Sequence, residues 1–93
     1  FNQHARDVKT VLDTVGVTRI HLAGLSYGSL VAQHFAILYP SMLYKLVLMA
    51  TFAHKTPHYE AIELSWWRAL EQGGYRLMLD IMLPNVLSEE YFS

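Results

Sequence analysis

Apolar residues recur every three or four positions over the first fifteen residues, which is the spacing of one helix face. Polar side chains such as Arg6 and Lys9 fall on the opposite face, and Gly16 follows as a stop signal. The pattern therefore predicts an amphipathic helix that ends before Gly16. Its apolar face is formed by Phe1, Ala5, Val8, Leu12 and Val15.

Two short apolar runs come next, "RIHLAG" at 19–24 and "KLVLMA" at 45–50. Each is too short for a helix and has the length of a buried strand. Between the two runs, apolar residues from Leu30 to Leu38 repeat at helical spacing until Pro40. Two strands joined through one helix form a parallel βαβ unit, so this part of the chain predicts α/β architecture.

The pattern is helical throughout the second half of the chain. Thr56 and Pro57 form a suitable N-cap and first-turn pair for a helix. The apolar residues of this helix are Ile62, Trp66, Trp67 and Leu70. The glycine pair Gly73 and Gly74 stops this helix. No further strand is predicted from residue 51 to residue 93.

A second helix, "YRLMLDIML" at 75–83, is apolar nearly all round and is expected to end at Pro84. Ser88 is placed to cap one last turn. We therefore divide the chain into an α/β part, residues 1–53, and a helical part, residues 54–93.

Composition narrows the classes of function. The chain has 93 residues, of which 53% are hydrophobic, so it is globular and long enough for one domain at most. The net charge is −1 and the seven basic residues are scattered, which leaves no footprint for nucleic acid or an anionic membrane. The absence of cysteine excludes disulfides and thiolate metal sites but leaves the compartment open, and we favour the cytoplasm.

Ser26 stands between two glycines in "GLSYG", where the first apolar run gives way to a helix. A turn from strand to helix within about one residue forces a strained conformation with positive φ, for which glycine is better suited than serine. We therefore infer that the serine hydroxyl has a function at the apex of this turn. We expect Gly24 and Gly28 to be required by the close approach of helix and strand, and Ser29 to be a neutral helix residue.

The same turn aims a helix N-terminus at the space beside the Ser26 hydroxyl. The backbone N–H of Tyr27 is then placed to bind the negative oxygen of a tetrahedral intermediate.

These residues carry a family resemblance. "GLSYG" between a strand and a helix is similar to the G-x-S-x-G nucleophile elbow of the α/β-hydrolase superfamily, and the succession of helix, strand, elbow, helix and strand over 1–53 resembles the centre of that fold. Residues 54–93 resemble the beginning of a helical cap. The resemblance implies a parallel βαβ core fragment of an α/β-hydrolase fold followed by cap helices.

The resemblance also implies a cofactor-free serine hydrolase acting on an ester, lactone, thioester or similar small acyl compound, with Ser26 as the nucleophile. In this family the acid and the histidine of the triad follow later strands, and a second oxyanion donor comes from an earlier loop. We therefore expect the chain to be the middle of a protein of about 250 or more residues, with the rest of the polypeptide required for activity.

The five histidines of the chain all lie in the wrong segments for the triad. We expect His54 and His58 to be exposed loop residues. His21 and His34 are expected to be packed and hydrogen-bonded.

Some apolar residues are candidates for lining a pocket above Ser26, although methionine and aromatic stripes at helical spacing usually belong to a core. These candidates are Leu25, Trp66, Trp67, Met78, Leu79 and Met82. Leu25 occupies a position where many family members carry histidine.

Two alternatives to a hydrolase stay open. The chain would also suit a ligand-binding or regulatory domain of the same fold that does not turn over substrate. An unrelated α/β module would use Ser26 as an ordinary helix cap, and a strained φ at Ser26 would exclude it.

Overall fold

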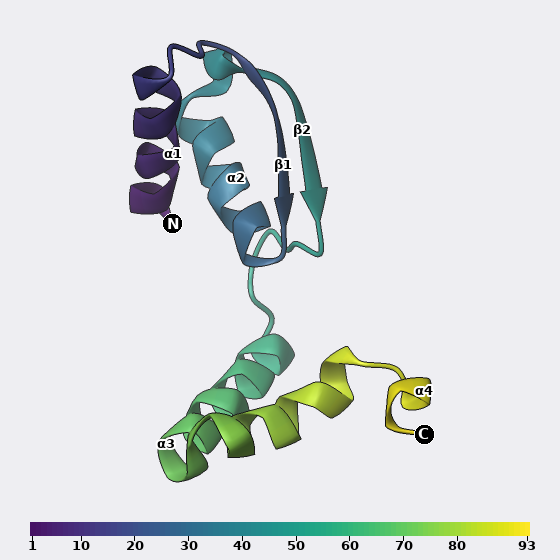
Figure 1. Ribbon diagram of the computed structural model, residues 1–93. Coiled ribbons are helices and arrows are strands. Elements are labelled where there is room, and N and C mark those ends of the chain that lie inside the picture. Colours follow the sequence, from purple (N-terminus) through teal and green to yellow (C-terminus); the bar gives the residue numbers. More distant parts are fainter. The chain divides into compact units, whose positions relative to one another are not determined.

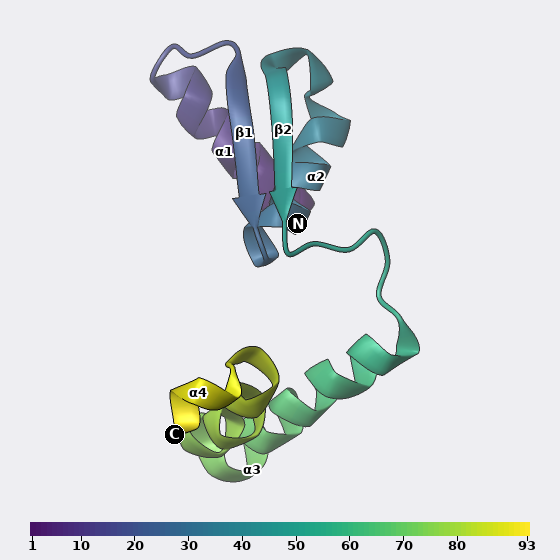
Figure 2. The ribbon, with the colours of Figure 1, turned by 90° about the vertical axis from the view of Figure 1, so that its right-hand side faces the viewer.

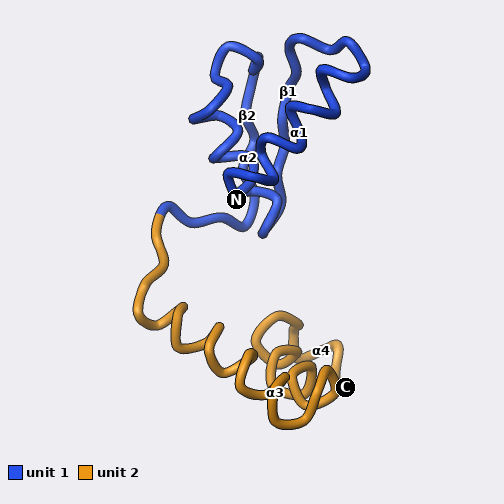
Figure 3. The backbone as a smooth tube through the Cα atoms, turned by 90° about the vertical axis from the view of Figure 1, so that its left-hand side faces the viewer, with its two compact units in different colours: residues 1–53 blue, residues 54–93 orange.

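The computed structural model describes all residues, 1–93, which form two compact units, Phe1–Ala53 and His54–Ser93 (Figure 3). The first unit contains, in order, α1 (Asn2–Thr14), β1 (Ile20–Leu25), α2 (Tyr27–Leu38), the 3-10 turn η1 (Pro40–Met42) and β2 (Leu43–Met49). The second unit contains α3 (Pro57–Val86) and α4 (Glu89–Phe92).

The first unit is built on a parallel pair of strands. β1 and β2 are hydrogen-bonded in parallel, with Leu22 opposite Leu46 and Leu25 opposite Met49, and α2 connects them. The predicted βαβ unit is confirmed, with β2 beginning two residues earlier than the apolar run indicated. Figures 1 and 2 show α1 and α2 on the same face of this sheet.

α1 ends just before Gly16, as predicted from the sequence. Gly16 has a φ of 75°, and its N–H bonds to the Asp13 carbonyl at 3.2 Å. The N–H of Val17 bonds to the Leu12 carbonyl at 2.9 Å. This is a Schellman motif, in which a left-handed residue satisfies the last free carbonyls of the helix.

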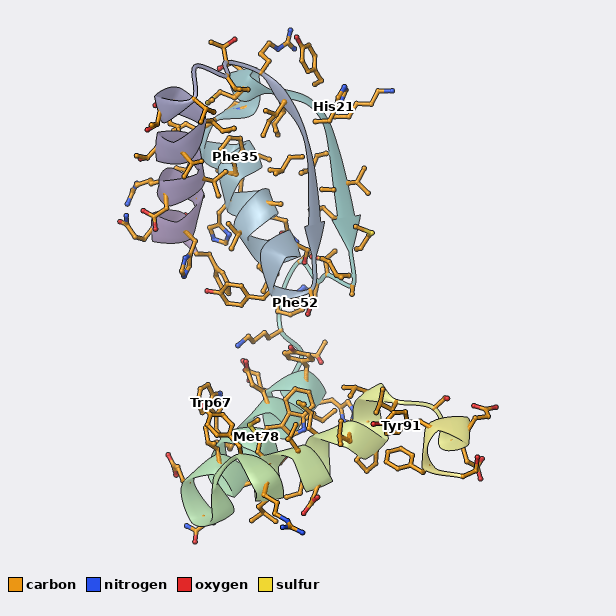
Figure 4. All side chains as sticks on the ribbon, viewed as in Figure 1. His21, Phe35, Phe52, Trp67, Met78 and Tyr91 are labelled. Carbon is orange, nitrogen blue, oxygen red and sulfur yellow. The ribbon has the colours of Figure 1, made fainter.

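The core of the first unit is small and lies between the two helices and the sheet. Phe35 of α2, labelled in Figure 4, is fully buried, and its ring packs against Tyr39 with the centroids 5.2 Å apart. The other buried apolar side chains are alanines, Ala5 of α1 and Ala32 of α2. Small side chains at these positions allow the two helices to approach closely.

The helical unit begins at a side-chain cap. The hydroxyl of Thr56 accepts a hydrogen bond from the Tyr59 N–H at 3.2 Å, and Pro57 is the first helical residue, as predicted. Lys55, just before the cap, pairs with Glu63 at 2.6 Å, and this hydrogen bond raises the pKa of the lysine. The start of α3 is therefore stabilised by the Thr56 cap and by the ion pair between Lys55 and Glu63.

The predicted break at Gly73 and Gly74 is present. Both residues have non-helical torsion angles, with a φ of 66° at Gly74, and the chain doubles back there (Figure 1). A Cβ atom at Gly73 would lie 2.6 Å from Cβ of Leu77, so glycine is needed for the close approach as well as for the turn.

The expected helix end at Pro84 is wrong. α3 continues to Val86 and is closed by a bond from the Leu87 N–H to the Leu83 carbonyl at 2.9 Å. The proline ring removes one backbone hydrogen bond and crowds the carbonyl four residues before it, and the helix continues for only two residues beyond Pro84. Ser88 occupies the N-cap position of α4, but its side chain makes no cap bond and instead bonds to Glu90, which lowers the pKa of that carboxyl.

Many large apolar side chains remain exposed in the first unit. Val11, Ile37 and Val47 are examples, and both outer edges of the two-stranded sheet are unpaired. Apolar patches and open strand edges of this kind favour association with other polypeptide. None of the helices combines the length and the apolar character needed to cross a membrane.

The 93-residue chain produced on its own is expected to aggregate or to be partly disordered, because its sheet edges and apolar faces lack cover. Size-exclusion chromatography with light scattering and thermal melts followed by circular dichroism would measure this. A soluble monomer that unfolds in one cooperative transition would contradict the expectation.

Candidate active site

A single residue, Ser26, turns the chain from β1 into α2. β1 ends at Leu25 and α2 begins at Tyr27, and Ser26 between them has a φ of 53° and a ψ of −119°. The predicted positive φ is therefore confirmed. A non-glycine residue in such a region costs roughly 1–3 kcal/mol and persists only where the surrounding structure imposes it.

The backbone of Ser26 is hydrogen-bonded on both sides, whereas its hydroxyl is free. Its N–H donates to the Met49 carbonyl at 2.9 Å, and its carbonyl accepts from the N–H of Ser29 at 2.9 Å. The side chain is exposed and makes no cap bond to α2. The structure thus fixes the position of the Ser26 hydroxyl without using that group, which speaks against a capping role.

Ser29 is not the neutral residue that the sequence suggested. Its side chain is fully buried, and its hydroxyl donates a short hydrogen bond to the carbonyl of Ser26. This second bond to the same carbonyl helps to hold the strained residue. The interaction was missed because helical spacing does not reveal how closely the first turn of α2 lies against the sheet.

The two glycines that flank the turn have different roles. A Cβ atom at Gly24 would lie 2.5 Å from the Gly28 carbonyl oxygen and 2.8 Å from Cα of Ser29, so the missing side chain is a steric requirement there. A Cβ atom at Gly28 would meet nothing within 4 Å. The expectation of a steric role for Gly28 is therefore wrong, because the close approach is made by its backbone against Gly24.

The amide of Tyr27 is the first N–H of α2 and is unpaired. As the first helical residue it has no partner within the helix, and its N–H makes no other hydrogen bond. The Tyr27 ring contacts the ring of Phe1, the N-cap residue of α1, and the ring of His4 on α1, with centroids 5.1 and 5.8 Å away. These ring contacts hold the side chain of Tyr27 against α1 and leave its amide at the helix N-terminus.

The loop after β2 also borders the turn, a position that was not predicted from the sequence. Ala50 has a φ of 49°, and it and Ser26 are the chain's two non-glycine residues with positive φ. The side-chain nitrogen Nε2 of Gln33 donates to Thr51 Oγ1 at 2.7 Å and to the Phe52 carbonyl at 3.0 Å. The position of this loop could have been predicted, because the residues that follow neighbouring parallel strands lie at the same edge of a sheet.

No histidine forms a hydrogen bond with Ser26. His34 is half-buried and its Nδ1 lies 2.8 Å from the Leu30 carbonyl oxygen, as expected of a packed residue. His21, labelled in Figure 4, is instead exposed, because the face of β1 that carries it is covered only by the ring of Tyr44, 5.1 Å away.

His54 and His58 are both exposed, as expected. His58 lies in the first turn of α3, however, and not in a loop. Its early position follows from the Thr56 cap, which starts the helix at Pro57.

Three of the predicted pocket residues come together in the helical unit. Trp66, Trp67 and Met78 line a groove of about 370 Å³, and Figure 4 shows the latter two on the segments of α3 that pass each other. The indole nitrogen of Trp66 is buried without a hydrogen-bond partner. The remaining lining residues are Glu63, Leu70 and Tyr75.

The other predicted pocket residues lie elsewhere. Leu25 is exposed and lines a separate groove of about 570 Å³ in the first unit, bordered by α1, β1 and α2. Met82 is half-buried and lines neither groove, and Leu79 is 40% exposed. No group of three or more histidine, aspartate or glutamate side chains is placed to hold a metal ion.

Comparison with known families gives a match over most of the chain. A family model described as "alpha/beta hydrolase fold" matches residues 1–82. No solved structure matches significantly.

Curated relatives are hydrolases from bacteria. A 2-hydroxy-6-oxo-6-phenylhexa-2,4-dienoate hydrolase of Comamonas testosteroni is 48% identical over 46 residues, which is 50% of this chain and 16% of the relative. A 2-hydroxy-6-oxononadienedioate/2-hydroxy-6-oxononatrienedioate hydrolase of Paraburkholderia phymatum is 52% identical over the same length and shares. An enzyme of the latter name from a Pseudomonas species is 32% identical over 97 aligned residues, 94% of this chain and 34% of the relative.

The chain thus spans about a third or less of the length of these relatives.

In the full-length protein, Gly24→Ala is expected to lower the free energy of unfolding by about 1–3 kcal/mol, because the new Cβ would clash with backbone atoms that cannot rotate away. Gly28→Ala is the matched control, since its Cβ has open space, and should change the free energy by less than about 1 kcal/mol. Denaturant titration of both variants measures the difference. Equal losses would show that the approach at Gly24 is not the constraint inferred here.

Proposed function

Because the chain belongs to the α/β-hydrolase fold family, we propose that it supplies the nucleophile of a serine hydrolase, with Ser26 as the attacking residue. The observation that carries the proposal is the strained, hydrogen-bonded backbone of Ser26 beside a free and exposed hydroxyl. Such strain is retained where function requires the geometry. In this proposal residues 54–93 begin a helical cap.

The proposed first step is attack of Ser26 Oγ on the carbonyl carbon of a bound small molecule. The Oγ–carbon bond forms, the carbonyl oxygen becomes an oxyanion, and the serine proton passes to a general base. The N–H of Tyr27 is the proposed donor to this oxyanion, since it is unpaired and opens α2. The tetrahedral intermediate then collapses, the leaving group takes the proton, and water releases the acyl group from Ser26.

The base and the acid are proposed to come from the remainder of the polypeptide. No histidine of this chain bonds to Ser26, and a serine hydroxyl is a weak nucleophile without a positioned base. The chain also covers only 16% to 34% of the length of its relatives. A second oxyanion donor is likewise assigned to the remainder.

Two kinds of scissile bond are compatible with this chemistry. The elbow suits the acyl bond of an ester, lactone or thioester, which is the substrate class we favour from the site. The relatives' names instead describe compounds with a ketone at carbon 6 and no ester group, so their hydrolysis has to break a carbon–carbon bond at that ketone. Both reactions pass through a tetrahedral oxyanion at a carbonyl carbon, which the Tyr27 amide would stabilise.

Replacement of Ser26 by alanine in the full-length protein is expected to abolish labelling by a fluorophosphonate probe. It should also lower hydrolysis of short acyl esters and of a 2-hydroxy-6-oxo-dienoate by on the order of a thousandfold or more, because the attacking oxygen is lost. Activity-based labelling and steady-state kinetics measure both effects. The fold should be retained, since the Ser26 side chain is exposed and unbonded.

The matched control is Ser41→Ala, which removes an exposed serine of η1. Ser29 is unsuitable because its buried hydroxyl supports Ser26. Equal hydrolysis without Ser26 would refute the assignment. An unlabelled and inactive wild-type protein of intact fold would favour a ligand-binding or regulatory domain.

A further inference from the structure

We propose that Gln33 is a positioning residue, which fixes the loop of residues 50–52 as one wall of the site at Ser26; the proposal rests on the function proposed above. The Gln33 side-chain nitrogen donates to Thr51 Oγ1 at 2.7 Å and to the Phe52 carbonyl at 3.0 Å. A side-chain amide carries two N–H groups, so one nitrogen serves both acceptors at once.

The loop is tied at both ends to the segment that Ser26 begins. At its start, the Met49 carbonyl accepts the Ser26 N–H at 2.9 Å. At its end, Gln33 binds Phe52, and Gln33 follows Ser26 by seven residues, which is two helical turns along the same face of α2. The loop is therefore held along that face, starting at the proposed nucleophile.

The strained residue of this loop lies next to Ser26. Leu25 is paired with Met49, so the residues that follow them, Ser26 and Ala50, leave the sheet side by side. Ala50 has a φ of 49°, which alanine adopts only where its surroundings impose it. Gln33 bonds to the two residues that follow Ala50, Thr51 and Phe52, and these bonds help to hold the loop in this course.

A fixed wall beside the nucleophile limits which acyl groups fit. Without the Gln33 amide, the loop loses both of these hydrogen bonds, and the wall becomes more mobile. The structure therefore assigns Gln33 to selectivity between acyl groups, and not to the attack itself.

The first test is amide hydrogen exchange in the full-length protein, which does not depend on activity. Gln33→Met keeps the length of the side chain but removes both donors, and exchange over residues 50–53 should become about tenfold faster. Gln3→Met is the matched control, because Gln3 is exposed on α1 and bonds only to Asp7. Unchanged exchange of the loop would overturn the proposal.

The second test is the ratio of kcat/KM for p-nitrophenyl acetate to that for p-nitrophenyl hexanoate. Gln33→Met should bring this ratio at least about threefold closer to one, and Thr51→Val, which removes one of the two acceptors, should give a smaller shift. The double variant should equal Gln33→Met alone, since both changes break the same bond. Gln33→Glu should not restore selectivity, because a carboxylate repels the Phe52 carbonyl.

A purely structural role predicts another result, in which the unfolding temperature falls while the ratio stays at the wild-type value. That result would overturn the proposal. If the wild-type protein hydrolyses neither these esters nor a 2-hydroxy-6-oxo-dienoate and is not labelled at Ser26, the proposed function fails and the site-wall proposal fails with it. The exchange measurement then still decides whether Gln33 holds the loop.

Discussion

The site depends on the close packing of α2 against β1 at Gly24, which leaves no room for a side chain there. The first turn of α2 lies so close to β1 that a Cβ atom there would overlap the backbone of Gly28. This approach allows the chain to turn within one residue, and the short turn in turn forces Ser26 into positive φ. The position of the free hydroxyl is thus a consequence of how helix and strand pack.

The strain at Ser26 is offset by bonds to its neighbours. One comes from the second strand of the sheet through the Met49 carbonyl, and two come from Ser29 in the first turn of α2. The turn is therefore coupled to the pairing of β1 with β2, since loss of that pairing would remove the bond to Met49. An isolated pair of strands is only marginally stable, so the geometry at Ser26 depends on whatever stabilises the pairing of β1 with β2.

Sequence periodicity was sufficient to predict α1, α2 and the two strands, because apolar spacing reports directly on which face of a helix or strand is buried. It did not predict η1 or the continuation of α3 past Pro84. The strain at Ser26 was also predictable, since the flanking runs left room for only one turning residue. The roles of Ser29, Ala50 and Gln33 were not predictable. Ser29 is buried and bonds within the first turn of α2, Gln33 bonds to the loop after β2, and Ala50 has a positive φ in that loop. None of these features leaves a periodic signal in the sequence.

The connection between the two units is short once its anchored residues are set aside. Phe52 is bonded to Gln33 in the first unit, and Lys55 is paired with Glu63 in the second. Only Ala53 and His54 lie between these anchors. The φ and ψ angles of these two residues are therefore the part of the connection that neither contact restrains, and a proline at position 54 would fix one of them.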